Sequence, residues 1–105
     1  MAISPLHRRN FHALFDAVIP GTFTYDPASA ADGVGATTTV TVTGAAVGDF
    51  VLVANGVDLQ GITITAYVSA ANTVAIRLQN ESGGTLDLAS STWKLLVLKP
   101  SKVFS

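Results

Sequence analysis

Regular alternation of apolar and polar side chains constrains this chain more than any other feature. From Thr37 onward the repeat is two residues, which is typical of a β-strand with one buried and one exposed face. In Ile62–Val68, four apolar residues alternate with Thr63, Thr65 and Tyr67. Such segments follow one another at intervals of roughly 10 to 15 residues with no helical repeat between them, which favours a sandwich or small barrel over βαβ units.

Five strands are predicted with clear boundaries, and two shorter ones are expected to accompany them. The five are Thr37–Thr43, Phe50–Ala54, Ile62–Val68, Thr73–Gln79 and Thr92–Leu98, and the shorter ones are Thr22–Tyr25 and Thr85–Leu88. Because Phe50–Ala54 is apolar on both faces, we expect it in the middle of the structure rather than at an edge. The third and fourth strands should form a hairpin through Ser69–Asn72. The fold class is therefore all-β, a small sandwich or barrel of about six to eight antiparallel strands.

The predicted core combines the inward-facing residues of these strands. Its members are Trp93, Phe50, Ile62, Ile64, Ile76, Leu78 and Leu95.

The N-terminal segment has a helical pattern instead. Four apolar residues are spaced i, i+3, i+4 and i+7, as on one face of a helix. They are Phe11, Leu14, Phe15 and Val18. Ser4 can cap the helix and Pro20-Gly21 can end it, which predicts a short amphipathic helix over Pro5–Ile19. A helix of this length is marginal alone, so its apolar face should dock on something.

These patterns divide the chain into three parts. Residues 1–21 are predicted to be a helix or arm, residues 22–36 a linker with a short strand, and residues 37–105 the β domain. Turn signals at Asp26-Pro27 and Asp32-Gly33 mark the linker.

Charge is unusually scarce. Charged residues make up 12% of the chain, against roughly 25% in typical soluble proteins. Between Gly33 and Ile76 only Asp49 and Asp58 are charged. Either a threonine-coated surface keeps the protein soluble, or much of this surface is buried against partner subunits, and we favour the second interpretation. A net charge of −1, with basic residues clustered only at Arg8 and Arg9, disfavours nucleic-acid binding.

Residues for catalysis are also scarce. The absence of cysteine excludes disulfides, thiolate zinc sites and a cysteine nucleophile. His7 and His12 would point in different directions on the predicted helix, and Glu81 is the only glutamate. We therefore expect no enzyme activity, no metal, no cofactor and no small-molecule substrate. No apolar run is long enough to cross a membrane, and we expect synthesis in the cytoplasm.

Trp93 and Tyr67 are the candidates for a sugar-binding face, since aromatic rings stack on sugar rings. Trp93 is better explained as a core residue because it shares a face with Leu95 and Val97, whereas Tyr67 lies on the threonine-rich side of its strand.

Two runs of the sequence resemble small virion proteins of tailed bacteriophages. They are YDPASAADGVGATTTVTVTGAAVGD at residues 25–49 and ITAYVSAANTVAIRLQNESGGTLDLASSTW at residues 64–93. The likeness extends over roughly residues 25–98, about 70% of the chain, and consists of turn and strand motifs. It implies a structural role without indicating which part of the particle the chain occupies.

A compact domain with an arm is most similar to a capsid decoration, or cement, protein. The alternative is a tail or fibre module that binds a host receptor or glycan. The resemblance implies a homotrimer on the capsid surface that binds the major capsid protein and stabilises the assembled shell by bridging its subunits. We expect flat threonine- or alanine-rich faces to join the subunits, and the helix to reach the shell or a neighbouring copy. The predicted partner-binding residues are Arg8, Arg9, Phe11, Leu14, Phe15, Val18 and Tyr67.

Overall fold

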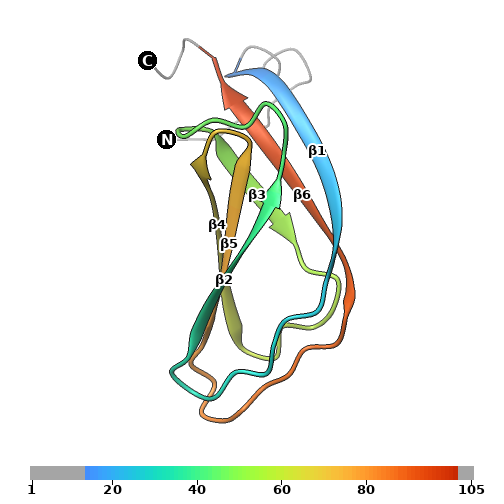
Figure 1. Cartoon of the computed structure of the whole chain (residues 1–105), viewed down its shortest axis with the longest axis vertical. Helices are drawn as coiled ribbons and strands as arrows, with labels where there is room; N and C mark the ends of the chain where they lie inside the picture. The colour runs from blue at the N-terminus through green and yellow to red at the C-terminus, as the bar shows by residue number, and fades with distance from the viewer. Residues whose placement is uncertain (1–13, 102–105) are drawn as a thin grey trace, which may run out of the picture.

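The alternating segments form two antiparallel sheets of three strands each, packed face to face as a sandwich (Figure 1). The computed structural model describes residues 14–101. Its strands are β1 (Phe15–Tyr25), β2 (Gly35–Thr41), β3 (Phe50–Ala54), β4 (Ile62–Ala70), β5 (Thr73–Asn80) and β6 (Ser91–Pro100). One sheet has the order β1-β6-β3 and the other β2-β5-β4. The all-β fold class is confirmed, and its arrangement is that of a sandwich.

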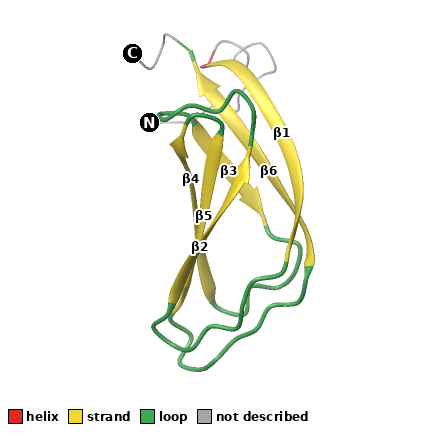
Figure 2. Cartoon of the chain, in the orientation of Figure 1, coloured by secondary structure: helices red, strands yellow, loops and turns green. Residues whose placement is uncertain are grey.

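Strand β1 replaces the last third of the predicted N-terminal helix. Phe15–Ile19 is extended, so the helix prediction is wrong from Phe15 onward, and over residues 14–101 helical geometry is confined to Leu14 (Figure 2). The rest of the predicted helix, residues 5–13, lies outside the described residues. β1 runs on through Pro20 and the predicted boundary at residue 21, and it includes the short strand expected at Thr22–Tyr25.

A second pattern in the same segment explains the strand. Ile19, Gly21, Phe23 and Tyr25 occupy alternate positions and are half-buried, while their neighbours are exposed. This repeat of two prevails because β1 pairs along its length with β6, which buries one face of the strand. Pro20 is accommodated because β1 is an edge strand.

Strand β3 has its predicted bounds but not its predicted place. It pairs with β6 alone and therefore lies at an edge of its sheet, so the expected central position is wrong. Phe50 and Leu52 expose 46% and 59% of their surface, and Phe50 is not a core residue. The strand is apolar on both faces because Val51 and Val53 pack against the core while Phe50 and Leu52 form an apolar outer surface.

The predicted hairpin is confirmed as β4 and β5. Val68 pairs with Val74 and Ile64 with Leu78, and their side chains share the inward face. Ala75 points outward yet is 2% exposed, because β5 is the central strand and Tyr67 and Thr39 flank this small residue from either side. The short strand expected at Thr85–Leu88 is reduced to a single bridge between Ala30 and Leu86.

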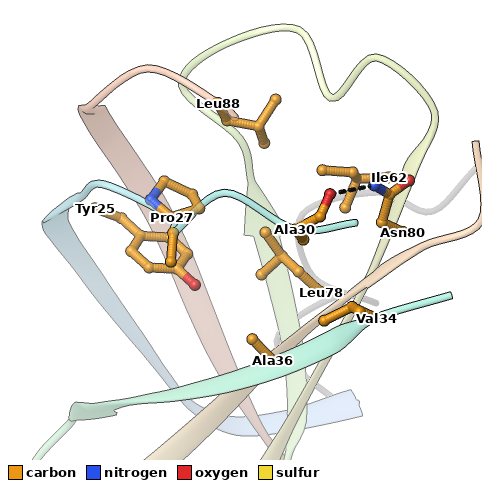
Figure 3. A pocket seen from close by; sticks show the side chains of 10 residues that line it. Tyr25, Pro27, Ala30, Val34, Ala36, Ile62, Leu78, Asn80 and Leu88 are labelled. Carbon is orange, nitrogen blue, oxygen red and sulfur yellow. Dashed lines mark hydrogen bonds between the residues drawn. The ribbon is translucent and has the colours of Figure 1, made fainter. Parts of the chain in front are cut away.

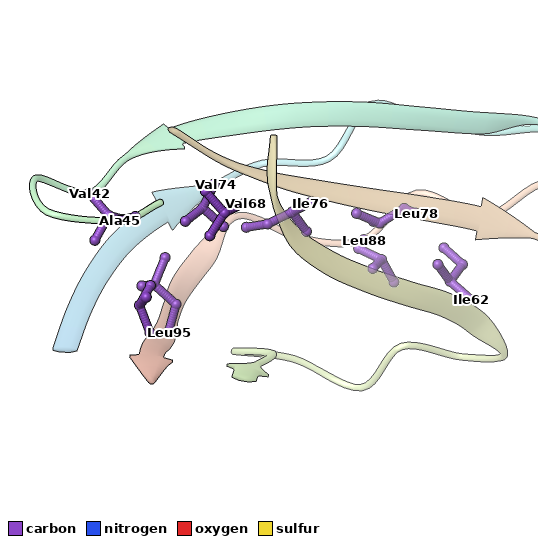
Figure 4. Packing of buried hydrophobic residues seen from close by; sticks show 10 residues of the cluster. Val42, Ala45, Ile62, Val68, Val74, Ile76, Leu78, Leu88 and Leu95 are labelled. Carbon is purple, nitrogen blue, oxygen red and sulfur yellow. The ribbon is translucent and has the colours of Figure 1, made fainter. Parts of the chain in front are cut away.

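Buried aliphatic side chains from both sheets fill the space between them (Figure 4). The cluster consists of Val42, Ala45, Ile62, Val68, Val74, Ile76, Leu78, Leu88, Leu95 and Val97. Trp93 is fully buried beside it, 5.3 Å from the Tyr25 ring, and its Nε1 donates to Ser91 Oγ at 3.0 Å. Of the predicted core, Ile64 is only half-buried. Trp93, Ile62, Ile76, Leu78 and Leu95 are confirmed.

Candidate binding surface

The outward side of the β1-β6-β3 sheet carries apolar residues from all three strands, and we call it the outer apolar face. On β6, Leu95 and Val97 point to the core, so Leu96 and Leu98 point outward. Strand pairing adds the aligned residues of β1 and β3 to the same side. The face comprises Val18, Pro20, Phe50, Leu52, Ala54, Leu96 and Leu98.

Cross-strand rows organise this face. In one row Val18 and Phe50 flank Leu98, which they help to reduce to 7% exposure. In the next row Pro20 and Leu52 flank Leu96. Phe15 lies edge-on to Phe50 with the ring centroids 6.1 Å apart, which continues the apolar surface toward the end of the sheet.

An open groove of about 360 Å³ runs over the middle of the face. Pro20 and Thr22 line it from β1, Leu52 and Ala54 from β3, and Lys94 is the one charged residue among its lining residues. Scattered exposed apolar residues are common on soluble proteins, but contiguous ones mark interaction surfaces. This face is therefore the candidate binding surface.

The outward side of the other sheet is polar. Threonines from β2 and β4 cover it, and its charged and amide side chains bond to one another. Arg77 donates to Thr37 Oγ1 at 3.1 Å and to Gln79 Oε1 at 3.3 Å, and Gln79 Nε2 donates to Glu81 Oε1 at 2.8 Å. This bonded network leaves the polar face suited to solvent contact.

The buried polar side chain of Asn80 holds loops together. Asn80 is 1% exposed, and its Nδ2 donates to the Ala30 carbonyl at 2.7 Å (Figure 3). The same Nδ2 donates to the Gly84 carbonyl at 2.9 Å. Its Oδ1 accepts from the Ser82 backbone N–H and hydroxyl at 3.0 and 2.7 Å. With both polar atoms of the amide bonded, Asn80 is a structural residue.

A small cavity of about 20 Å³ adjoins Asn80, with Tyr25 and Leu88 among its lining residues (Figure 3). That volume suits about one water molecule. Burial raises the pKa of the Tyr25 hydroxyl above its ordinary value of 10.0. The cavity is too small for a substrate.

No group of three or more metal-ligating side chains occurs within residues 14–101. Among the same residues, no helix is long and apolar enough to cross a membrane.

The predicted partner-binding residues separate into four groups. Arg8, Arg9 and Phe11 lie outside the described residues. Leu14, whose carbonyl accepts from the Ser101 N–H at 2.8 Å, and Phe15 are half-buried at the end of β1 and β6. Val18 belongs to the outer apolar face. Tyr67 is 46% exposed on the opposite, threonine-rich side, so the structure does not bring it together with the others.

Sequence reasoning missed Leu52, Leu96 and Pro20, which form the middle of the face. Two segments of the sequence indicate that an apolar surface lies outside the core. Phe50–Ala54 and the LLVL run at residues 95–98 are apolar at both alternate positions, although only one set can face a two-layer core.

No protein-family model, curated protein or solved structure matches the chain. What the chain binds is accordingly inferred from its own residues and surfaces.

Proposed function

We propose that this chain is a structural subunit of a virus particle, a capsid decoration protein that binds the assembled shell through its outer apolar face. The observation that carries the proposal is the exposure of Leu52, Phe50 and Val18 on one side of a sheet that is otherwise well packed. The likeness of residues 25–98 to small virion proteins of tailed bacteriophages supports it, as does the low share of charged residues.

The size of the face sets the strength of such a contact. For a face of the size usual for the largest apolar patch on a monomer, roughly 400 Å², burial would contribute about 10 kcal/mol. Association itself costs about 4–15 kcal/mol, so one contact would be weak. A trimer that touches several shell subunits at once gains affinity by multivalency, and weak contacts then suffice.

Stabilisation of the shell follows from linkage. A subunit that binds only the assembled shell stabilises it by about 4 kcal/mol per site when its concentration is roughly a thousand times Kd. Because a shell offers many equivalent sites, the combined effect resists rupture.

The chemistry of the face indicates what it would meet on the major capsid protein. Leu52 and Leu96 would pack against an apolar strip on the capsid protein. Lys94, at one end of the groove, would pair with an acidic residue of the capsid protein beside that strip. A partner surface of the opposite kind, polar and basic, would fit poorly.

Cryo-electron microscopy of virions and heating of stripped particles test the proposal together. Copies should occupy the shell lattice, and particles stripped of this protein should rupture at a lower temperature that returns to normal when the protein is added back. Copies found only at the tail, or an unchanged rupture temperature, would contradict shell stabilisation.

A second candidate function rests on Tyr67. Its ring is 46% exposed among the threonines of β4, and exposed aromatic rings stack on sugars, as a tail or fibre module that binds a glycan would require. A glycan array distinguishes this alternative, because binding that is lost in Tyr67→Ala would support it and the absence of any bound glycan would oppose it.

A further inference from the structure

β3 and β4 are edge strands of different sheets, and they approach each other along one side of the sandwich. An apolar groove of about 170 Å³ lies there, lined by Val51, Leu52, Val53, Ile64 and Ala66. Apart from Leu52, these side chains pack against the core, yet they are only half-buried. We call this groove and its two flanking strands the β3/β4 seam.

Neither edge of the seam has the features that protect exposed strands. Such edges usually carry a charged residue, a proline or a bulge that prevents pairing with another chain. β3 has none of these, and β4 has only a bulge between Val68 and Ala70, at its end. By contrast, the edge strand β1 contains Pro20 and has a bulge near its start.

We propose that copies of this chain associate through the β3/β4 seam, by pairing the edge strands of one copy with those of the next. Strand addition supplies backbone hydrogen bonds, and alternate side chains fill the groove. A second copy is a matched partner because the seam is apolar and uncharged on both edges, so identical seams meet without repulsion.

The lengths of the two edge strands set the size of the contact. The nine residues of β4 extend roughly 30 Å and the five of β3 roughly 17 Å, and two sheets about 10 Å apart with their outer side chains are roughly 20 Å thick. Two such sides would bury roughly 900 Å², which is at the low end for specific protein interfaces. Pairing β3 of one copy with β4 of the next can close a ring, including the trimer that the resemblance implies.

This inference rests on the proposed function and deepens it by assigning the contact between copies. It leaves most of the outer apolar face for the shell, with Leu52 bordering both surfaces. It is tested on the isolated protein, so failure of self-association is distinguishable from failure to bind shells.

The first test introduces a lysine at either of two positions in the same cross-strand row and compares the two variants. Ala66 on β4 and Thr38 on β2 flank Ile76 from opposite sides, and both are half-buried and inward-facing. The wild-type mass in solution should be a multiple of 10.8 kDa. Ala66→Lys should reduce it to that of one chain, whereas Thr38→Lys should leave it unchanged. A monomeric wild type, or an assembled and folded Ala66→Lys, would overturn the proposal.

The second test needs no destabilising change and decides the matter if Ala66→Lys does not fold. The chain lacks cysteine, so introduced thiols report only on their own contacts. The side chains at positions 52 and 65 lie on opposite outer faces of one molecule. When β3 of one copy pairs with β4 of the next, Leu52→Cys of the first copy and Thr65→Cys of the second would lie on the same face. Oxidation of the double variant should give linked chains, and Leu52→Cys alone should do so if β3 pairs with β3. Lys94→Cys on the central strand should stay unlinked. Linkage at Lys94→Cys, or none in any variant, would overturn the proposal.

Discussion

The Nζ of Lys99 lies 2.7 Å from the Oδ2 of Asp49 and joins the end of β6 to the loop between β2 and β3. Lys99 also donates to the Gly44 carbonyl at 2.9 Å, and Asp49 Oδ2 accepts from the Ala46 N–H at 2.9 Å. The loop carries Ala45, which is 3% exposed in the core. The ion pair therefore holds a loop that passes from one sheet to the other.

Removing this ion pair should destabilise the fold modestly. Asp49→Ala is expected to lower the free energy of unfolding by about 1–2 kcal/mol, because it removes two hydrogen bonds and leaves the Lys99 charge unpaired. Urea denaturation followed by the fluorescence of Trp93, the only tryptophan, measures the change. Lys94→Met, which alters an exposed lysine of the same strand, is the control. Equal stability of Asp49→Ala and the control would show that the pair contributes nothing.

Asn80 should contribute more to the free energy of unfolding than an exposed asparagine does. Asn80→Ala removes four hydrogen bonds in a buried position, and we expect a loss of about 2–4 kcal/mol. Asn55→Ala is the matched variant, because exposed Asn55 makes one bond, to the Val57 carbonyl, and should cost below about 1 kcal/mol. Similar losses in the two variants would contradict the structural role of Asn80.

Ionisation of Tyr25 should lower the free energy of unfolding at alkaline pH. Burial raises its pKa above 10.0 in the folded chain, so the unfolded chain releases this proton first. Stability is therefore full below pH 10 and declines as the pH rises through 10 toward the folded pKa. Denaturation series at several pH values from 9 upward should show a shallower decline in Tyr25→Phe than in the wild type. Parallel declines would contradict the effect of burial.

The strands of the second sheet could be predicted from sequence because their alternation of apolar and polar residues fits a half-buried strand and no other element. In Ile62–Val68 and Thr73–Gln79 the large aliphatic residues face the core and the polar ones face outward, with the small Ala75 as the one aliphatic residue on the outward side, and a short reversal joins the two strands. Local pattern and tertiary packing agree in these strands, so the hairpin followed, together with the core positions of Ile62, Ile76 and Leu78.

The first sheet could not be predicted in the same way. Phe15, Val18 and Ile19 fit a helical repeat, while Ile19, Phe23 and Tyr25 fit a strand, and only pairing with β6 decides between them. The residues of the candidate surface were recognisable as apolar, but their exposure depends on β3 lying at an edge, which its composition alone does not reveal.

Core and surface apolar residues should respond differently to substitution. Ile76→Ala is expected to cost about 2–5 kcal/mol, because Ile76 is fully buried. Leu52→Lys should change stability by less than about 0.5 kcal/mol, because Leu52 is 59% exposed. A large loss in Leu52→Lys would mean that Leu52 supports the fold rather than a contact with a partner.

Co-sedimentation with shells that lack this protein tests the central claim most directly. The wild type should bind saturably. Leu52→Lys should bind at least about tenfold more weakly, because it places a charge in the middle of the outer apolar face. Thr39→Lys, which adds the same charge to the polar face of the other sheet, should bind like the wild type. Equal binding of Leu52→Lys and the wild type would contradict the assignment of the outer apolar face as the shell-binding surface.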